Sequence, residues 1–140
     1  GTTGNPKGVL YSHRSTLIHT IAAANPDSFN LSSLDVIMPI APMFHANAWG
    51  IPYVATMIGA KLVLPGRHLD GKSIYNLLER EKVTFTAAVP TIWLMLFQFL
   101  ETEKKKLNHL KKKNSQPWQT QSNHRMANDL NHQKRAPQPL

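Results

Sequence analysis

Glycines, threonines and one lysine crowd the first eight residues of the chain, GTTGNPKG. Glycines let successive backbone N–H groups converge on one anion without obstruction by Cβ atoms. The hydroxyls of Thr2 and Thr3 add donors, and Lys7 adds a mobile positive charge that suits phosphate oxygens. Two residues separate Gly4 from Lys7, which excludes the nucleoside-triphosphate loop in which glycine and lysine are adjacent. The segment predicts a phosphate cradle, with a plain turn as the alternative.

A second stretch, APMFHANAWG at residues 41–50, holds a histidine and a tryptophan among apolar neighbours. The ring of His45 is able to donate a hydrogen bond that orients a carboxylate. Trp49 lies four residues further on, so the two side chains share a face if the segment is helical. Both residue types are also ordinary in a protein core. The residues alone therefore leave substrate contact and core packing open for each of them.

Segments of alternating type surround these two stretches and would position them. Ser12 is a suitable helix N-cap, Gly59 a suitable helix end and Pro90 a suitable first helical residue. Helices are predicted at residues 12–25, 47–60, 70–82 and 90–101, and strands at 36–41, 61–65 and 83–89. This alternation predicts an α/β fold, namely a partial doubly wound and mostly parallel sheet with right-handed crossovers.

Residues 36–60 contain no charged side chain, and a stretch of this length is long enough to span a bilayer. However, Pro39, Pro42 and Pro52 interrupt it, so an unbroken helix is disfavoured and a buried core segment is predicted. The large apolar side chains of the last predicted helix are also expected in the core: Trp93, Met95, Phe97 and Phe99. The chain has no cysteine, which excludes disulfides and thiolate metal sites within it.

The net charge of +8 is unevenly distributed along the chain. Residues 1–101 carry a net charge of +1, whereas residues 102–140 carry +7. We therefore predict a partial catalytic domain over residues 1–103 and a basic, disordered tail over residues 104–140, of which residues 104–113 are able to extend the last helix. The polar texture of the tail indicates a frameshift product.

The tail also raises two alternatives to an enzymatic role. A nucleic-acid-binding surface would use residues 104–113, but the tail offers only Trp118 for base stacking, so no nucleic-acid partner is expected. A metal site would use His109, His124 and His132, but their spacing matches no closed zinc pattern.

The opening segment GTTGNPKGV resembles the Thr/Gly-rich phosphate loop of the adenylate-forming (AMP-binding) acyl-CoA synthetase superfamily. APMFHANAWG resembles the second motif of that superfamily, and VTFTAAVPTIW at residues 83–93 resembles the strand and helix that follow. The resemblance covers about residues 1–112. The stretches PMFHANAW and GAKLVLPG are most similar to bacterial medium- and long-chain fatty-acyl-CoA synthetases.

The resemblance implies a fatty-acid–CoA ligase that forms an acyl-adenylate from ATP and then transfers the acyl group to coenzyme A. It assigns phosphate binding to the opening loop, at Thr2, Thr3, Gly4, Lys7 and Gly8. Lys7 would neutralise the departing pyrophosphate, and Thr3 would lie near Mg²⁺. His45 would act where nucleotide and carboxylate meet, and both His45 and Trp49 would lie along the acyl channel, with Trp49 lining or gating it. Another adenylate-forming ligase, for an aryl or short-chain acid, is the alternative.

Later motifs of the superfamily are absent from the sequence, including a Tyr-Gly-x-Thr-Glu-like loop for Mg²⁺. The chain is therefore expected to be an internal fragment that has no ligase activity by itself. Half of a doubly wound sheet is also expected to leave an unpaired edge and an uncovered face, which weakens folding. For the parent enzyme we expect a cytoplasmic location, peripheral membrane association and a homodimer.

Overall fold

Three parallel strands form the centre of the protein in a computed structural model, which describes residues 4, 5 and 7–111 of the chain. The strands are β1 (Val36–Pro39), β2 (Lys61–Leu62) and β3 (Phe85–Ala87), and their order in the sheet is β2-β1-β3. In the register of the sheet, Ile37 of β1 faces Leu62 on one side and Phe85 on the other. The predicted parallel sheet is confirmed, with strands shorter than expected.

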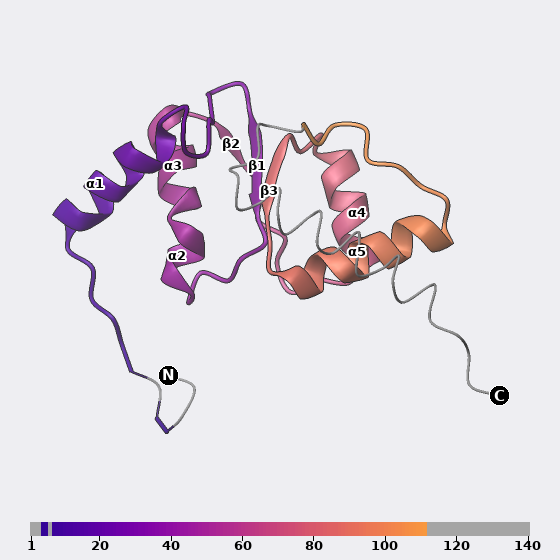
Figure 1. Cartoon of the computed structure of the whole chain (residues 1–140), viewed down its shortest axis with the longest axis horizontal. Coiled ribbons are helices and arrows are strands. Elements are labelled where there is room, and N and C mark those ends of the chain that lie inside the picture. The colour runs from indigo at the N-terminus through magenta and orange to yellow at the C-terminus, as the bar shows by residue number, and fades with distance from the viewer. Residues whose placement is uncertain (1–3, 6, 112–140) are drawn as a thin grey trace.

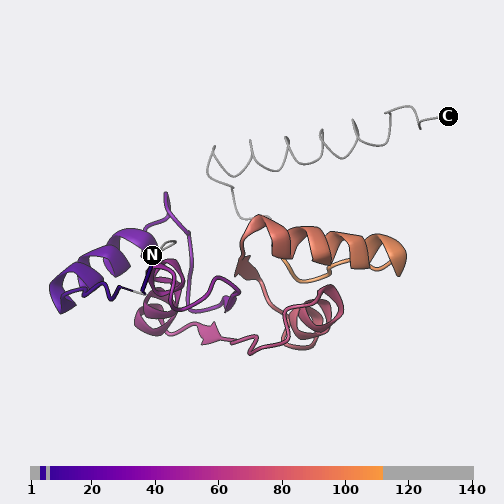
Figure 2. The same cartoon turned by 90° about the horizontal axis from the view of Figure 1, so that it is seen from below.

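Helices cover both faces of this sheet. They are α1 (His13–Ala24), α2 (Ala46–Trp49), α3 (Ile51–Ile58), α4 (Gly71–Arg80) and α5 (Pro90–Thr102). The first three lie on one side of the strands and the last two on the other (Figure 1). The view from below shows the same separation (Figure 2). The α/β doubly wound prediction is therefore confirmed, while the expected uncovered face is wrong for this part of the chain.

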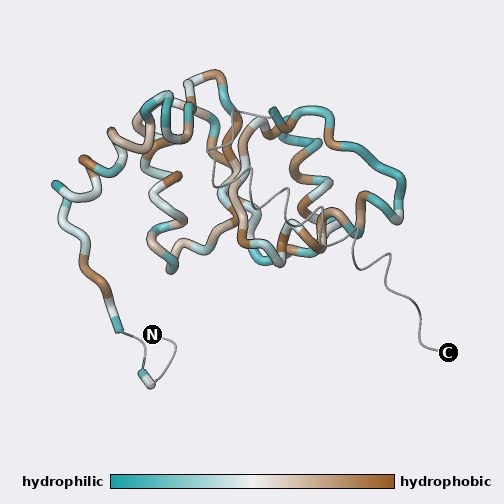
Figure 3. The backbone as a smooth tube through the Cα atoms, in the orientation of Figure 1, coloured by the Kyte–Doolittle hydropathy of each residue, from teal (hydrophilic) through white to brown (hydrophobic). Residues whose placement is uncertain are grey.

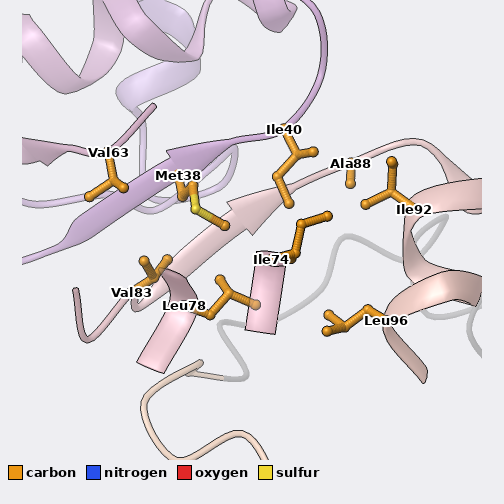
Figure 4. Close-up of a cluster of buried hydrophobic side chains, with 9 residues drawn as sticks. All are labelled: Met38, Ile40, Val63, Ile74, Leu78, Val83, Ala88, Ile92 and Leu96. Atoms are coloured by element: carbon orange, nitrogen blue, oxygen red, sulfur yellow. The ribbon is translucent and has the colours of Figure 1, made fainter. Parts of the chain in front are cut away.

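The core consists of two apolar clusters, one on each face of the sheet. Successive side chains of a strand point to opposite faces, so Ile37 and Met38, both completely buried, enter different clusters. Met38 joins the cluster between the sheet, α4 and α5 (Figure 4), in which Ile74 and Leu96 are also buried. Figure 3 shows that hydrophobic residues are frequent in the strands, whereas hydrophilic residues dominate the segment after α5.

The helix ends have local causes that can be read in the sequence. Ser12 precedes α1 and its hydroxyl accepts a hydrogen bond from the N–H of Ser15 at 3.1 Å. Asp70 caps α4 in the same way, at 2.9 Å from the N–H of Ser73. Gly59 ends α3 with a φ of 72°, a left-handed conformation that glycine adopts without strain.

The predicted single helix over residues 47–60 is wrong. The segment divides at Gly50 into α2, which is a left-handed turn, and α3, which is an ordinary right-handed helix. No described helix is long and apolar enough to cross a membrane. The charge-free stretch at residues 36–60 instead supplies core residues, including Ile51 and Val54 with no exposed surface, as its prolines predicted.

Helix α1 is confirmed, but its apolar side chains do not face the core. Leu17, Ile18 and Ile21 are each 57% exposed. The buried residues of the helix are Thr20 and Ala23. The hydroxyl of Thr20 tolerates burial because it donates a hydrogen bond to a carbonyl oxygen one turn earlier, at 2.7 Å.

Helix α5 also buries residues other than the expected ones. Ile92 and Leu96 are buried, whereas Phe97 is 41% exposed and Trp93 is half-buried, with its ring stacked on Phe97. Met95 and Phe99 are half-buried. The expectation that Phe97 belongs to the core is therefore wrong. The face of α5 that packs against α4 carries Ile92 and Leu96, and Phe97 lies outside it.

Residues 104–111 continue from α5 as an irregular segment rather than as the predicted helical extension. Leu107 and Leu110 pack against the cluster of α4 and α5, and the N–H of Lys111 donates to the carbonyl oxygen of Thr84 at 3.1 Å. This first part of the predicted tail is therefore packed on the domain. The remainder, residues 112–140, lies outside the described residues.

Candidate functional site

A cavity of about 970 Å³ lies between α1, the left-handed turn α2 and the start of α5. We call it the aromatic cavity after the six rings in its wall: Tyr11, Phe29, Trp49, Tyr53, Phe85 and Trp93. Phe29 and Phe85 contact each other, with ring centroids 5.8 Å apart. Tyr11 and Tyr53 are exposed, so the cavity opens to solvent along that part of its wall.

The aromatic cavity lies where ligands commonly bind in open parallel sheets. The chain passes from β1 to β2 through α3 on one face, and from β2 to β3 through α4 on the other face (Figure 1). Such a change of direction leaves a crevice at the carboxyl ends of the strands on either side of it. Ala87 at the end of β3, and Ala88 directly after it, form part of the wall.

Three polar side chains of the wall form hydrogen bonds within the protein. The hydroxyl of Thr86 donates to the carbonyl oxygen of Met38 at 2.6 Å, and that of Ser15 donates to the carbonyl oxygen of Ser12 at 2.9 Å. The His19 ring contacts the carbonyl oxygen of Trp49. Because these groups already have partners, the surface that they leave for a ligand is chiefly apolar.

One wall of the cavity is built from a strained backbone. Five successive residues from Ala46 to Gly50 have φ values between 45° and 71°. The left-handed conformation costs about 1–2 kcal/mol for each residue that carries a Cβ atom. A run of this kind persists only where its surroundings determine it, and such runs concentrate at functional sites.

Local contacts account for part of this conformation. The N–H of Ala48 donates to the carbonyl oxygen of His45 at 3.0 Å, and the N–H of Gly50 donates to that of Asn47 at 3.1 Å. Ala48 has no exposed surface, so its methyl group fixes the turn against the core. The turn thereby presents the half-buried Trp49 to the aromatic cavity.

The structure separates the two residues predicted for the acyl channel. Trp49 lines the aromatic cavity, whereas His45 is exposed and is not part of its wall. His45 has an extended backbone with φ −103° and ψ 102°, so the condition that would place both side chains on one helical face is not met. Their chemical roles stay predictions.

The described residues of the predicted phosphate loop are all open to solvent. Gly4, Lys7 and Gly8 are exposed, and Gly4 has a φ of 78°, a conformation that exposes the backbone N–H groups of a loop to an anion. A Cβ atom added at Gly4 or Gly8 would meet nothing within 4 Å. Thr2 and Thr3 lie outside the described residues, and none of Gly4, Lys7 and Gly8 lines the aromatic cavity.

A metal centre made of protein side chains is not found in the described part of the chain, where no group of three or more His, Cys, Asp or Glu residues is placed to hold an ion. Thr3, the residue predicted near Mg²⁺, lies outside this part. The described loop residues carry N–H donors and the charge of Lys7, whereas the described part of the chain supplies no cage for a cation.

Comparison with known proteins decides the family. A family model described as "AMP-binding enzyme" matches residues 1–132. The chain belongs to this AMP-binding enzyme family. The match includes the predicted phosphate loop, the turn α2 and the whole of the described fold, so the family resemblance drawn from the sequence motifs is confirmed.

Curated relatives of this AMP-binding chain are CoA ligases. A medium-chain-fatty-acid–CoA ligase of Ectopseudomonas oleovorans is 60% identical over 66% of this chain and 17% of its own length. A long-chain-fatty-acid–CoA ligase of Thermus thermophilus is 53% identical over 80% of this chain and 21% of its own. A 3-methylmercaptopropionyl-CoA ligase of Ruegeria lacuscaerulensis is 55% identical over 66% of this chain and 17% of its own. The chain thus spans about a fifth of the length of these relatives.

Sequence reasoning missed most of the cavity wall of this AMP-binding chain. Tyr53, Phe29 and His19 come from three different segments, and no spacing rule joins them. One local signal was present, because glycine, here Gly50, is the usual residue where a backbone adopts a left-handed conformation.

Proposed function

We propose that the chain is the phosphate-binding and acyl-binding part of a fatty-acid–CoA ligase. The observation that carries the proposal is the aromatic cavity itself, an apolar chamber beside a strained turn in an AMP-binding enzyme. Its volume of about 970 Å³ falls at the upper end of the roughly 300–1,000 Å³ typical of small-molecule sites. A long alkyl chain uses such a wall fully, whereas an aryl or short-chain acid leaves much of it empty.

The proposed reaction has two steps. A carboxylate oxygen of the fatty acid forms a bond to the α-phosphorus of ATP, and the bond from that phosphorus to pyrophosphate breaks. The sulfur of coenzyme A then bonds to the acyl carbon, AMP leaves with the former carboxylate oxygen, and the thiol proton passes to solvent. Both steps depend on stabilising phosphate charge more than on protein acid–base chemistry.

The residues of this chain contribute binding and charge to these steps. Backbone N–H groups of Gly4, Lys7 and Gly8 and the hydroxyls of Thr2 and Thr3 hold the outer phosphates, and Lys7 neutralises the pyrophosphate as it leaves. His45 donates a hydrogen bond that orients the carboxylate at the nucleotide. Mg²⁺, held with the help of Thr3 and the phosphates, supplies further positive charge when bound.

A chain-length series of saturated fatty acids tests the proposal on the purified 140-residue chain by calorimetry. Each additional methylene buried in the aromatic cavity contributes about 0.8 kcal/mol, so affinity is expected to rise about four-fold per methylene from hexanoate to decanoate. Benzoate and butyrate are expected to bind weakly. An affinity that does not depend on chain length would contradict the proposal.

Two matched variants on α1 locate the binding site. Thr16 is half-buried in the wall of the aromatic cavity, and Thr16→Phe fills that space. Leu17 is its neighbour but is exposed and outside the wall, so Leu17→Phe changes the same helix without entering the cavity. Loss of decanoate binding only in Thr16→Phe is expected, and equal binding by both variants would place the acyl chain elsewhere.

The proposal extends to a cytoplasmic, homodimeric enzyme that touches membranes peripherally to collect its substrate. The exposed apolar side chains Leu17, Ile18 and Ile21 on α1 support a contact of this kind, because they gather on one helix. Flotation with liposomes and sedimentation of the purified protein separate membrane contact from dimer formation.

A further inference from the structure

We infer that His19 is a positioning residue that holds Trp49 in the wall of the aromatic cavity and thereby sets which acyl chains fit there. The inference deepens the proposed function and rests on it for the identity of the ligand. It starts from a contact between α1 and the left-handed turn α2, whose residues lie thirty positions apart in the chain.

The contact is a hydrogen bond from a side chain to the backbone of the turn. Nε2 of His19 lies 3.2 Å from the carbonyl oxygen of Trp49. A carbonyl oxygen only accepts hydrogen bonds, so Nε2 carries the proton and donates it. The bond fixes the peptide group that follows Trp49, and with it the direction in which the indole leaves the backbone.

Gly50 shows that the fit between the ring and the turn is close. A Cβ atom built on Gly50 would lie 2.5 Å from both Cδ2 and Nε2 of His19, which is closer than real Cβ atoms approach other atoms. Gly50 also has a φ of 71°. The glycine therefore suits the left-handed conformation, and a Cβ atom at this position would push the histidine ring away from the turn.

The other hydrogen bonds of the turn described above are local, and they join residues within a few positions of one another. Among the hydrogen bonds of the described residues, the bond from His19 ties the strained segment to a separate helix. Without it, the turn keeps its local hydrogen bonds and the buried Ala48, but the carbonyl oxygen of Trp49 is no longer held, and the indole shifts in the wall. His19, Trp49 and Gly50 all line the aromatic cavity, so the change alters its shape directly.

The test uses the purified chain with ¹⁵N-labelled tryptophan, whose indole N–H signals report on each ring by NMR. Trp49→Phe identifies the signal of Trp49 and Trp93→Phe that of Trp93, and the remaining signal, from Trp118, serves as the internal reference. His19→Leu keeps a similar volume but removes the donor, whereas His19→Gln restores a donor near the position of Nε2. His68→Leu makes the same change at an exposed histidine outside the cavity wall.

The expected result is a shift of the Trp49 signal in His19→Leu, with the Trp118 signal unchanged, and decanoate affinity lower by about five-fold. This factor corresponds to the roughly 1 kcal/mol of one neutral hydrogen bond. His19→Gln is expected to return the Trp49 signal toward its wild-type position and the decanoate affinity to within about two-fold of the wild-type value. If His19 only packed against its neighbours, restoring a donor would not rescue either readout. His68→Leu is expected to change neither readout.

Two further variants keep the test decisive if His19→Leu does not fold. The side chain in His19→Asn is too short to reach the carbonyl oxygen of Trp49. This variant is therefore expected to give the same result as loss of the donor, in contrast to His19→Gln, which has the same amide group on a longer side chain. Gly50→Ala displaces the ring from the other side and is expected to shift the same Trp49 signal. An unchanged Trp49 signal and unchanged decanoate affinity in the donor-loss variants overturn the inference.

The two proposals fail in different ways. If the wild-type chain binds no fatty acid but its Trp49 signal still depends on the donor at residue 19, the positioning role stands and the acyl-binding proposal is wrong. If decanoate binds and the signal ignores the donor, the acyl site stands and the positioning role is wrong.

Discussion

Asp35 and Thr84 join the amino ends of β1 and β3 through a hydrogen bond of 2.8 Å between the threonine hydroxyl and Oδ1 of the carboxylate. Asp35 is 2% exposed. Its other carboxylate oxygen accepts from the N–H and the hydroxyl of Ser32, at 2.8 and 3.1 Å. The threonine hydroxyl also accepts from the N–H of Val36 at 3.0 Å. The pair therefore sets where the two strands begin.

Removal of the threonine hydroxyl is expected to destabilise the fold. Thr84→Val preserves shape but leaves a buried carboxylate oxygen and the Val36 N–H without that partner, which costs about 1–3 kcal/mol. Thr84→Ser keeps the hydroxyl and is expected to cost less. Urea unfolding followed by circular dichroism measures both, and equal midpoints for wild type and Thr84→Val would contradict the assigned role.

The contact between α4 and α5 depends on Gly71. A Cβ atom there would overlap the carbonyl oxygen of Met95 and approach Cβ of Phe99 to 2.9 Å. Gly71→Ala is therefore expected to separate the helices and lower the free energy of unfolding by about 1–3 kcal/mol. Gly8→Ala is the control, because the space around Gly8 is open. A Gly71→Ala protein with wild-type thermal stability would show that the helices pack less closely.

Acid is expected to loosen the segment after α5 through Glu79. Burial raises the pKa of Glu79. Hydrogen bonds from the backbone and side chain of Asn108, at 2.9 and 2.6 Å, and the nearby His109 lower the pKa by more than burial raises it, so the pKa lies below its ordinary value. A lowered pKa means that the ionised form is favoured in the folded state. Its contribution is complete above the ordinary glutamate pKa of about 4.3 and is lost as pH falls through the lower folded value.

The measurement for Glu79 is the unfolding midpoint at intervals between about pH 3 and pH 7. Glu79→Gln is expected to show a smaller loss of stability on acidification than wild type. Glu101→Gln removes a carboxylate from the exposed surface of α5 and serves as the control for net charge. Parallel curves for wild type and Glu79→Gln would rule out the linkage.

Trp49 is expected to influence chain-length preference. Trp49→Ala enlarges the aromatic cavity and removes apolar contact, so octanoate loses affinity while a longer acid extends into the new space. The ratio of dodecanoate to octanoate affinity is expected to rise, by about four-fold for each methylene newly buried. Trp49→Phe is expected to lie between the two. Competition binding with a fluorescent fatty acid gives this ratio, and an unaltered ratio would assign Trp49 to packing alone.

The sequence predicted the parts of the fold that local rules determine. The caps at Ser12 and Asp70, the end of α3 at Gly59 and the alternation of strands and helices all agree with the structure. Apolar strands without charges predicted a sheet buried on both faces, which is where Ile37 lies.

Features that depend on distant residues were not predictable. In the sequence Ala-Asn-Ala-Trp only Asn47 favours left-handed φ, and the conformation of the whole run depends on contacts such as that with His19, thirty residues away. The exposed position of Leu17 and Ile18 could not be read from helical spacing, because spacing identifies a face but not what covers it. The aromatic cavity likewise needs four segments in their final positions.

The strand order has a consequence for synthesis of the chain. β1 is central, yet both of its partners follow it, with Ile37 opposite Leu62 and Phe85. A growing polypeptide therefore carries its most deeply buried strand without a neighbour until β2 leaves the ribosome, and without its second neighbour until β3 does. During that interval the apolar residues 36–41 are open to intermolecular pairing. Chaperone protection of the nascent chain is expected to matter most before the α4 and α5 half has closed over them.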